Sequence, residues 1–561
     1  MKKVMTGAQA IVECIKLEGI NHAFCVPGES YLELLDAIYE EDSIELISNR
    51  HEGGAAFMAE AYGKASGKPG IAMATRGVGG ANLAIGVHTA HQDSTPMVVF
   101  LGQVDSKFRG REGFQEVELD QFFQHICKWA VEIRDVERTP ELVQRAFRIA
   151  RTGRPGPVIV SLPADILSQK AEMEFGPVIT NPKPKPAENE IIESLQVLKN
   201  SEHPLIIAGG GVIASNGEEN LQRFAEKYNV PVLASFRRHD VFPNNHELYV
   251  GHSGLGTPVE ILETIKQADT IVAIGTRFSE VTTQGYSVVS KAQKIIHIDI
   301  DFNTIGKVYS PVVGIVADAN EALKSLLTAE DDFVNVPEKW KKWAQDRRTV
   351  YQTISEIKEE KHHNEVDMKQ IIAALQKYAP ANTIFTNDAG NFSGWLHNFY
   401  QFNYRKTYIG PISGAMGYGV PAAVGIKLAR PDCPVISLSG DGGFMMTLQE
   451  LETAVRYNVP IISIVVNNNM YGTIRMHQEM HHPERVIGTL LGNPDFKKLG
   501  ESFGVFSASV TNDADFEGVL LEAMKANKPA LIEVVCDPNK ISFKSTIESI
   551  RAKHKQQVVN N

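Results

Sequence analysis

The segment Pro434-Val435-Ile436-Ser437-Leu438-Ser439-Gly440-Asp441-Gly442 decides the fold of the last third of the chain. Its first six residues form an apolar run that is short enough to be a buried parallel strand. Gly440 and Gly442 permit a tight turn whose backbone N–H groups face an anion, while Asp441 offers a hard oxygen to a cation. The segment therefore predicts an α/β fold that binds a ligand at a strand end.

An asparagine-rich segment, Asn467-Asn468-Asn469-Met470, closes the next apolar strand, expected over Pro460 to Val466 after a helix over Thr447 to Tyr457. Asp441 and Asn468 thus both end strands, where open α/β sheets bind ligands. Magnesium is usually held by one or two protein groups plus substrate phosphates, so these two side chains and a backbone carbonyl suffice. The pair predicts a magnesium-diphosphate clamp; the alternative is a glycine turn and an ordinary polar loop.

These segments resemble the thiamine-diphosphate signature, and residues 5–537 resemble the acetolactate synthase and pyruvate oxidase group of thiamine-diphosphate enzymes. The resemblance and the βαβ rhythm of the chain predict three doubly wound parallel-sheet α/β domains. We expect a pyrimidine-binding domain in residues 1–175, a central nucleotide-binding-like domain in 187–330 and a diphosphate- and magnesium-binding domain in 365–545. The proline-rich stretch between the first two is expected to be an extended linker.

Bulk properties limit the function. The 561 residues suggest about three domains, and the net charge of −11 without a basic block argues against nucleic acid as a partner. The sequence contains no run of eighteen apolar residues, so it predicts no membrane span, and the start of the chain has no signal-peptide pattern. Five scattered cysteines indicate reduced core residues. We therefore expect a soluble, cytoplasmic protein without membrane partners.

Local patterns predict several elements. Thr6 is expected to cap a helix that ends at Gly19, before a strand over His22 to Val26. Strands are also expected over Pro204 to Ala208, Thr270 to Ile274 and Lys294 to Ile300 in the central domain. The charged segment 338–363 is helix-like, and the polar tail 551–561 is expected to fray.

Glu52, in Arg50-His51-Glu52-Gly53-Gly54-Ala55, is the candidate catalytic residue. In the family that this chain resembles, a glutamate contacts the pyrimidine ring and favours the tautomer that activates the thiazolium carbon, and Glu52 matches its position. Such a carboxyl group needs dry surroundings, which the small and apolar residues that follow make plausible. The alternative is an ordinary acid in the first turn of a helix.

The resemblance assigns further cofactor contacts. Met416 would be an apolar wedge that bends the cofactor; the alternative is a core filler. The metal would be held by Asp441, Asn468 and the carbonyl of Met470. The resemblance implies that the cofactor is bound by Pro27, Gly28, Glu52, Gly390, Asn391, Phe392, Gly414, Met416, Gly440, Gly442, Gly443, Tyr471, Gly472 and Thr473.

The substrate end departs from the family pattern. Arg76 and Val78 replace serine and proline of a conserved family loop, so that Arg76 either meets an additional anionic group of the substrate or pairs with a nearby carboxylate. Met476 and His477 replace a Gln-Trp pair, which predicts an altered acceptor pocket. The resemblance implies that substrate is bound by Arg76, Gly77, Phe114, Gln115, Ile474 and His477.

The central domain carries glycine turns at 209–211 and 275–278 and acids at Asp299 and Asp301, a pattern that fits dinucleotide binding. The resemblance makes FAD a candidate beside thiamine diphosphate and Mg²⁺; relatives with an empty domain or another nucleotide leave the alternative open. It also implies a homodimer or dimer of dimers, with active sites between subunits.

The expected reaction is decarboxylation of a 2-oxo acid such as pyruvate with carboligation, as in acetolactate synthase, a transferase. The alternative is a lyase, decarboxylase or hydrolase that acts on another 2-oxo acid, a 1,2-dione or an acyl-CoA without efficient ligation. Glu52 and Asp441 argue against a third reading, a non-enzymatic nucleotide-binding subunit.

Overall fold

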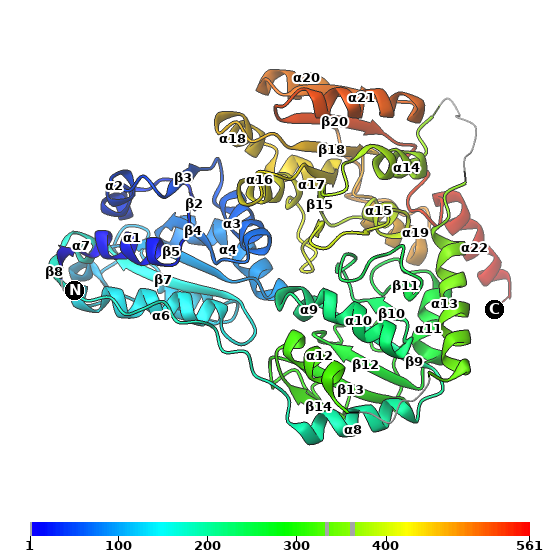
Figure 1. The fold of residues 1–561 in the computed structure, drawn as a ribbon. Helices are drawn as coiled ribbons and strands as arrows, with labels where there is room; N and C mark the ends of the chain where they lie inside the picture. Colours follow the sequence, from blue (N-terminus) through cyan, green and yellow to red (C-terminus); the bar gives the residue numbers. More distant parts are fainter. Residues whose placement is uncertain (1–2, 331–335, 359–364, 561) are drawn as a thin grey trace.

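Three parallel β-sheets of six strands each, covered by helices, make up the protein (Figure 1). The computed structural model describes residues 3–330, 336–358 and 365–560. A short antiparallel pair, β1 (Lys3–Thr6) with β8 (Lys170–Met173), lies outside the three sheets. The architecture confirms the predicted class of three doubly wound α/β sheets. In the described part of the chain, no helix has the length and apolar character to cross a membrane.

The first sheet has helices on both faces. In β4, Ile71 and Met73 face one apolar cluster, which includes α1 and α6, while Ala72 and Ala74 face another, which includes α3 and α4. The strands, in spatial order, are β3 (Glu45–Ser48), β2 (His22–Cys25), β4 (Gly70–Thr75), β5 (Met97–Gln103), β7 (Pro157–Pro163) and β6 (Trp129–Glu132). The helices are α1 (Gly7–Leu17), α2 (Leu32–Tyr39), α3 (Glu52–Ser66), α4 (Arg76–Asp93), α5 (Leu119–Phe123), α6 (Thr139–Arg151) and α7 (Ala164–Ser168).

The third sheet repeats the strand order of the first: second, first, third, fourth, sixth and fifth along the chain. Its strands are β16 (Tyr408–Ile409), β15 (Ile384–Asn387), β17 (Val435–Gly440), β18 (Ile462–Asn467), β20 (Ala530–Val535) and β19 (Phe506–Val510). Its helices are α14 (Met368–Tyr378), α15 (Ser393–Phe399), α16 (Gly419–Ala429), α17 (Asp441–Thr447), α18 (Glu450–Arg456), α19 (Gly472–His481), α20 (Phe496–Phe503) and α21 (Asp513–Lys525).

The central sheet has a different order, third, second, first, fourth, fifth and sixth, which is that of the dinucleotide-binding fold. Its strands are β11 (Tyr249–His252), β10 (Val232–Ala234), β9 (Pro204–Ala208), β12 (Thr270–Ile274), β13 (Lys294–Asp299) and β14 (Val313–Val316). Its helices are α8 (Glu188–Lys199), α9 (Gly210–Ala214), α10 (Glu218–Tyr228), α11 (Val259–Gln267) and α12 (Ala319–Thr328), and α13 (Glu338–Ser355) runs alongside.

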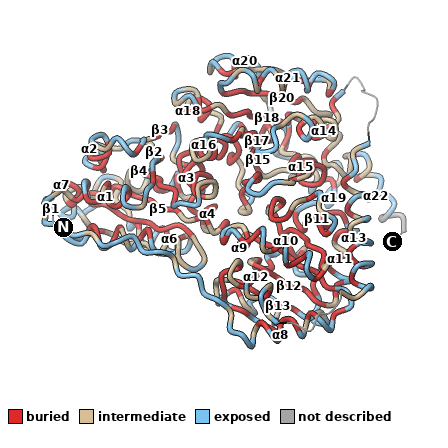
Figure 2. Tube along the Cα trace, in the orientation of Figure 1, coloured by how far each residue is buried: buried red, intermediate tan, exposed pale blue. Residues whose placement is uncertain are grey.

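The first and third sheets share one apolar core. Helices α3 and α16 pack against each other, and the cluster around them includes strand residues of both sheets, such as Ala72 and Val435. Figure 2 shows the chain buried along α3 and α16. The two sheets are therefore fixed relative to each other within one chain.

Three local expectations need correction or completion. The helix expected over Thr447 to Tyr457 is present as the shorter α18, and an additional helix, α17, precedes it and begins at Asp441, where we expected a turn. The tail is not frayed over its described length, because α22 (Ile547–Asn560) is helical and packs on α19. The charged segment is helical as α13, and residues 359–364 of it lie outside the described residues.

Candidate functional site

Several predicted site residues follow the strands between which the order of the first and third sheets reverses. In the third sheet the reversal lies between β15 and β17, which lead into the segments that begin at Asp388 and Asp441. In the first sheet it lies between β2 and β4, which lead to Pro27 and Arg76. Such reversal points open a crevice at the carboxyl ends of the strands, where doubly wound sheets bind ligands.

The predicted metal ligands converge around Asp441. This residue is buried, and burial raises its pKa. The nearby backbone N–H groups of Asn469 and Met470 oppose this rise, so the two predicted segments lie close together. These N–H groups donate to Asn467 Oδ1 at 3.1 Å and to Asn468 Oδ1 at 3.3 Å. Within the described residues, no three acidic, histidine or cysteine side chains form a metal-binding cluster.

Asn493 is a side-chain hydrogen-bond partner of Asp441 that the sequence did not predict. Its Nδ2 donates to Asp441 Oδ2 at 2.7 Å, to Asn467 Oδ1 at 2.9 Å and to Asn469 Oδ1 at 3.2 Å. It follows α19 in a loop, between Gly492 and Pro494, where the sequence carries no signal beyond a turn.

The segment Gly390–Phe392 contacts Tyr471–Thr473, and the resemblance assigns both segments to the cofactor. The Asn391 N–H donates to Thr473 Oγ1 at 3.1 Å, and the Thr473 hydroxyl donates to Asn391 Oδ1 at 3.1 Å. Glycine is required at Gly443, because a Cβ there would lie 2.6 Å from Asp388 Oδ2. Burial raises the pKa of Asp388 to about 6.

Glu52 begins α3, and its Oε2 accepts a hydrogen bond from Asn82 Nδ2 at 2.9 Å. A residue of the third sheet's region fixes the turn before Glu52. The Glu450 carboxylate, on α18, accepts hydrogen bonds from the N–H groups of Arg50 at 3.2 Å and His51 at 3.1 Å. Glu450 is buried, and burial raises its pKa. The sequence offered no sign of this role, because Glu450 looks like an ordinary first-turn acid.

Pro27 and Gly28 follow β2 and face the start of α4. Glycine is required at position 28, because a Cβ there would lie 2.6 Å from the Cβ of Thr75. Gly414 is exposed and Met416 is half-buried, in the loop that leads to α16. Met416 is thus no fully buried core filler.

The predicted substrate residues of the first sheet lie together. Arg76 Nη1 donates to the carbonyl of Phe114 at 3.2 Å, and the Gly77 N–H donates to that of Gln115 at 3.1 Å. Arg76 and Gln115 have φ angles of 44° and 63°, a region that costs energy for residues other than glycine. Arg76 also pairs with Glu29 at 3.2 Å, so it has the carboxylate partner that one interpretation foresaw.

The substrate residues of the third sheet lie on α19. Ile474 and His477 are exposed, whereas Met476 packs inward on the apolar cluster of Met470 and Ile541 and accepts from Asn391 Nδ2 at 3.5 Å. The structure therefore separates the replaced pair: Met476 faces the diphosphate segment, and His477 faces solvent beside His481.

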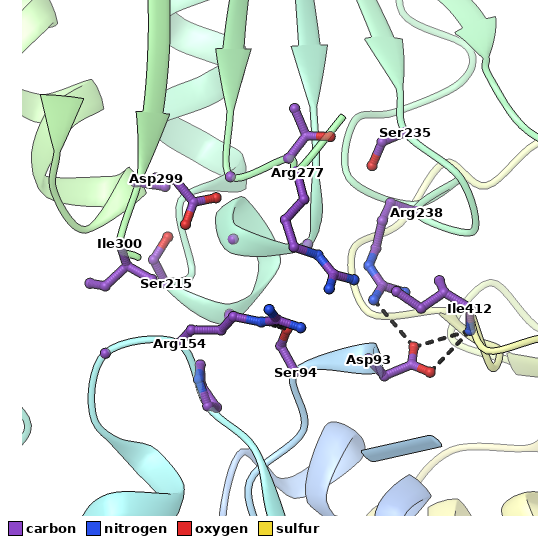
Figure 3. A pocket seen from close by; sticks show the side chains of 18 of the residues that line it. Asp93, Ser94, Arg154, Ser215, Ser235, Arg238, Arg277, Asp299, Ile300 and Ile412 are labelled. Carbon is purple, nitrogen blue, oxygen red and sulfur yellow. Dashed lines mark hydrogen bonds and ion pairs between the residues drawn. The ribbon is translucent and has the colours of Figure 1, made fainter. Parts of the chain in front are cut away.

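A cavity of about 350 Å³ lies at the strand ends of the central sheet (Figure 3). Three arginines, Arg154, Arg238 and Arg277, point into it, and Asp299 lines it at the end of β13, beside β12 from which Arg277 follows. Burial, together with the nearby Arg154 charge, lowers the pKa of Arg277 to about 10. The predicted glycine turns at 209–211 and 275 line the cavity and bond to each other, with Gly211 N–H donating to Gly275 O at 3.0 Å.

Comparison with known proteins gives a consistent answer over the whole chain. Residues 5–122, 191–326 and 388–534 match the N-terminal TPP binding, central and C-terminal TPP binding domains of thiamine pyrophosphate enzymes. The chain is 34% identical to a probable acetolactate synthase large subunit of Methanocaldococcus jannaschii over 546 residues, 95% of this chain and 92% of the relative.

Two further relatives agree. An acetolactate synthase large subunit of Buchnera aphidicola subsp. Schizaphis graminum is 34% identical, with 93% of each chain covered. That of Lactococcus lactis subsp. lactis is 32% identical, covering 95% of this chain and 93% of the relative. The likeness thus extends through all three sheets rather than to one of them.

Proposed function

The chain belongs to the thiamine pyrophosphate enzymes, in the group of acetolactate synthase large subunits, and from this premise we propose how its own residues serve the reaction. It is an enzyme that decarboxylates a 2-oxo acid with thiamine diphosphate and joins the remaining fragment to a second carbonyl compound. This carboligation is favoured over decarboxylation or C–C lysis alone, because all three relatives above are acetolactate synthases. When bound, thiamine diphosphate supplies the electron sink that lets the 2-oxo acid lose carbon dioxide.

The residues around Asp441 fit a magnesium diphosphate. One buried carboxylate and several amide oxygens suit a hard cation that completes its coordination with phosphate oxygens and water. Asp441, Asn468 and the Met470 carbonyl would hold Mg²⁺, with the diphosphate beside Asn391 and Thr473. The cation would be bound weakly without the diphosphate, since Asp441 supplies only one negative charge.

Glu52 would hold the proton that activates the cofactor's pyrimidine ring. Its Oε2 is already occupied by Asn82, so Oε1 is the atom free to meet a ring nitrogen. Glu450 fixes the preceding backbone, so that the carboxyl group is positioned before the cofactor arrives. Met416 would support the ring from below, with Gly414 leaving room for it.

Arg76 would orient the substrate. Its Nε is buried and lacks a hydrogen-bond partner among the described residues, while Nη1 is shared by Glu29 and Phe114. A substrate with a carboxylate or a further polar group would compete with Glu29 for this cation. Gly77, Phe114 and Gln115 would line the same end, and Ile474 and His477 would border the acceptor.

A second copy of the chain would complete the site. Phe114, Ile474 and Leu490 expose 72%, 55% and 70% of their surface, and they border the substrate and metal segments. Large exposed apolar side chains next to a site indicate a surface that a partner covers. We therefore assign the active sites to the interface of a homodimer, as a dimer or a dimer of dimers.

The central cavity fits a ligand that carries a diphosphate. Arg154 donates to the Ser94 hydroxyl and the His91 carbonyl, and Arg277 donates to the Gln92 carbonyl, so an anion would neutralise cations that these contacts leave charged. Asp299 lies at the end of β13, where an acid can meet a ribose. FAD is the first candidate; a free adenosine diphosphate shares the same chemistry. An absorbance spectrum of the purified protein distinguishes them, because only flavin absorbs visible light.

The observation that carries this proposal is the pairing of two carboxylates with amides, Glu52 with Asn82 and Asp441 with Asn493. Each carboxylate follows the carboxyl end of a strand, β3 for Glu52 and β17 for Asp441. Mass spectrometry of products from pyruvate tests it, and acetolactate is expected. Glu52→Gln should lower kcat at least about a hundredfold while magnesium-dependent cofactor binding persists. The exposed Glu45→Gln is the matched control. Pyruvate consumed without acetolactate or another ligation product would refute the carboligation.

A further inference from the structure

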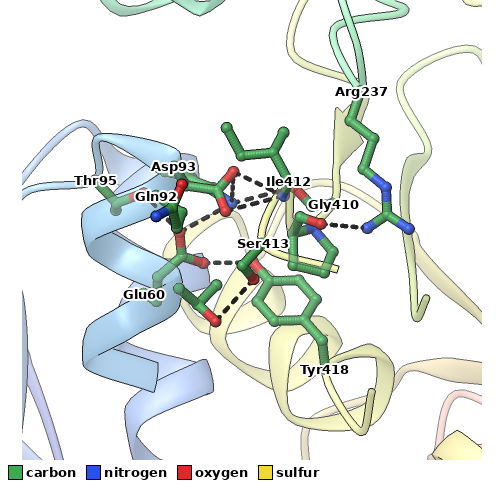
Figure 4. Close-up of polar contacts among 12 residues, drawn as sticks. Glu60, Gln92, Asp93, Thr95, Arg237, Gly410, Ile412, Ser413 and Tyr418 are labelled. Atoms are coloured by element: carbon green, nitrogen blue, oxygen red, sulfur yellow. Dashed lines mark hydrogen bonds and ion pairs between the residues drawn. The ribbon is translucent and has the colours of Figure 1, made fainter. Parts of the chain in front are cut away.

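Four consecutive residues, Gly410 to Ser413, precede the Gly414–Met416 segment, and each is held by a different side chain. We call these four residues the loop anchor (Figure 4). Lys64 Nζ donates to Gly410 O at 3.3 Å, Arg237 Nη1 to Pro411 O at 2.6 Å, Ile412 N–H to Asp93 Oδ2 at 3.0 Å, and the hydroxyls of Ser413 and Thr89 pair at 3.1 Å. The loop anchor is thus fixed by the first and central sheets' regions rather than by its own sheet.

Asp93 is the most connected of these groups. Its side chain is 0% exposed, and it lies 2.9 Å from Lys64 Nζ and 3.4 Å from Arg238 Nη2. Burial alone would raise the pKa of Asp93, but the charges of Lys64 and Arg238 hold it below its usual value. Asp93 is therefore a buried carboxylate that two cations and one backbone N–H share.

Lys64 is itself balanced by a second buried acid. Its Nζ lies 2.9 Å from Glu60 Oε1, and the hydroxyls of Thr95 and Tyr418 donate to Glu60 at 2.5 Å each. Tyr418 starts the helix that follows Met416. The segment that carries Met416 is consequently held at both ends by one buried polar network. A change at Asp93 should therefore alter the mobility of the chain both at Ile412 and at Tyr418.

The same carboxylate borders the central cavity. Asp93, Arg238 and Ile412 all line it, and Figure 3 shows both Arg238 and the Ile412 backbone reaching the Asp93 oxygens. An anion in this cavity would meet Arg238 together with Arg154 and Arg277. The anion would compete with Asp93 for Arg238. With Arg238 drawn to the anion, the Asp93 carboxylate would interact more strongly with Lys64 and with the Ile412 N–H.

We infer that Asp93 is a positioning residue that couples the central cavity to the cofactor-binding loop. It fixes the loop anchor, and through Arg238 it makes the stiffness of Gly414–Met416 depend on an anionic ligand in the cavity. The inference rests on the proposed role of Met416. Because coupling between two binding sites is reciprocal, the two ligands should each strengthen the binding of the other.

The first test uses the full chain without thiamine diphosphate, after any copurified nucleotide has been removed. Hydrogen exchange of residues 408–418 is measured with and without ADP. ADP should slow exchange in this segment, and the Kd of thiamine diphosphate with Mg²⁺ should fall about fivefold when ADP is present. Unchanged exchange and an unchanged Kd at saturating ADP would overturn the coupling, and these measurements need no variant.

The second test uses Asp93→Asn, which keeps the shape but removes the charge. It should bind ADP, yet lose the effect of ADP on the thiamine diphosphate Kd, and exchange at 408–418 should accelerate. The matched control is Asp269→Asn, since Asp269 accepts hydrogen bonds from Glu202 N–H and His203 N–H far from the loop anchor. It should lose stability without altering that segment.

Met416→Ala separates a failure of the inference from a failure of the proposed function. If Met416→Ala leaves both kcat and cofactor binding unchanged, the proposed role of Met416 is wrong. If Met416→Ala impairs them while Asp93→Asn keeps normal exchange at 408–418 and full ADP linkage, the proposed function survives and the inference on Asp93 is overturned.

Discussion

At the scale of single residues, each of the two carboxylates of the candidate site accepts a hydrogen bond from an asparagine side chain. Asn82 holds one oxygen of Glu52, and Asn493 holds one oxygen of Asp441. Neither amide would touch the reacting atoms in the proposed function. Partners of this kind orient a ligand atom before the metal or cofactor binds, and their loss typically weakens metal affinity about 10- to 100-fold.

Replacing Asn493 by alanine should therefore weaken magnesium-dependent binding of thiamine diphosphate about tenfold. The change frees Asp441 Oδ2, removes the Asn493 donor of the Asn469 amide oxygen and leaves the Asn467 amide oxygen with the Asn469 N–H as its donor. Titration of Mg²⁺ at fixed thiamine diphosphate, read by calorimetry, measures the shift. Asn382→Ala, which removes an amide with only long contacts, is the control. Equal magnesium dependence in both variants would contradict the orienting role.

His252 gives a prediction for pH. Burial, with a smaller effect of the Lys544 charge, lowers its pKa to about 4, and its Nε2 has no hydrogen-bond partner among the described residues. As the pH falls below about 6.5, His252 becomes protonated in the unfolded chain, whereas in the folded protein it stays neutral until near pH 4. The stability that neutral His252 contributes is therefore complete above about pH 6.5 and is lost on acidification.

His252→Phe should remove this loss. Between pH 7 and pH 5, the free energy of unfolding of the variant should gain on the wild type by on the order of 2 kcal/mol. Burial raises the pKa of Asp240 and Asp388 to about 6, an opposite dependence that both proteins share and that cancels in the comparison. Denaturant unfolding at both pH values measures it, and a pH-independent difference would count against the prediction.

At the scale of elements, α22 acts as a brace for α19. Arg551 of α22 makes two hydrogen bonds to Glu479 of α19, at 2.8 and 2.7 Å, while Arg475 contacts the same carboxylate at 2.6 Å. The hydrogen bond from Arg551 is the main cause that lowers the pKa of Glu479 to about 2. Since α19 carries Ile474 and His477, the C-terminal helix fixes the helix that would border the acceptor.

Arg551→Met should loosen α22 and raise the KM for the acceptor several-fold, with little effect on the first decarboxylation. Glu479 is buried, but Arg475 remains to balance it, so the stability cost should be about 1–3 kcal/mol. Hydrogen exchange over α22 and separate KM values for donor and acceptor check this. Lys555→Met, an exposed residue 3.9 Å from Glu484, is the matched control and should change neither.

Elements were predictable where their own residues decide them. The apolar runs of β9 and β12 have the expected bounds, because five buried residues between polar or turn residues leave little choice. Asp441 begins a helix, although the glycines at 442 and 443 suggested a turn. Position 443 is glycine for a different reason, because the Asp388 side chain leaves no room for a Cβ there. The polar tail 551–561 continues a helix that begins before it, and in that earlier part Ile547 and Ile550 pack with Met470 and Ile541, contacts that no local pattern reveals.

The candidate site was predictable to the same degree. Glu52 and Asp441 follow strand-end patterns that are local in sequence. Their partners are not: Asn493 meets Asp441 across 52 positions, Glu450 meets Arg50 across 400, and Asp93 meets Ile412 across 319. The packing of the first sheet's region on the third brings the last two pairs together, and the loop between α19 and α20 brings Asn493 to Asp441. The sequence alone therefore could not identify these partners.

At the scale of the whole molecule, one chain holds Glu52 and Asp441 rigidly but surrounds each with its own neighbours. Glu52 contacts Asn82 of the first sheet's region, and Asp441 contacts Asn493 and the Asn469 backbone. The exposed Phe114 and Leu490 lie beside these two regions. A two-fold dimer would cover both apolar surfaces at once and bring Glu52 of one chain to Asp441 of the other.

Mixing two inactive variants tests this arrangement. Glu52→Gln and Asp441→Asn should each be inactive alone, because every site of either homodimer lacks one carboxylate. After unfolding and refolding together in equal amounts, half of the dimers contain one chain of each kind, and each such dimer has one site with both carboxylates intact. Activity should recover to about a quarter of the wild-type value per chain. If Glu52 and Asp441 served the same site within one chain, no mixture would contain an intact site and the activity would stay at zero. Sedimentation of the refolded mixture, compared with wild type refolded alone, separates that outcome from a failure to reassemble.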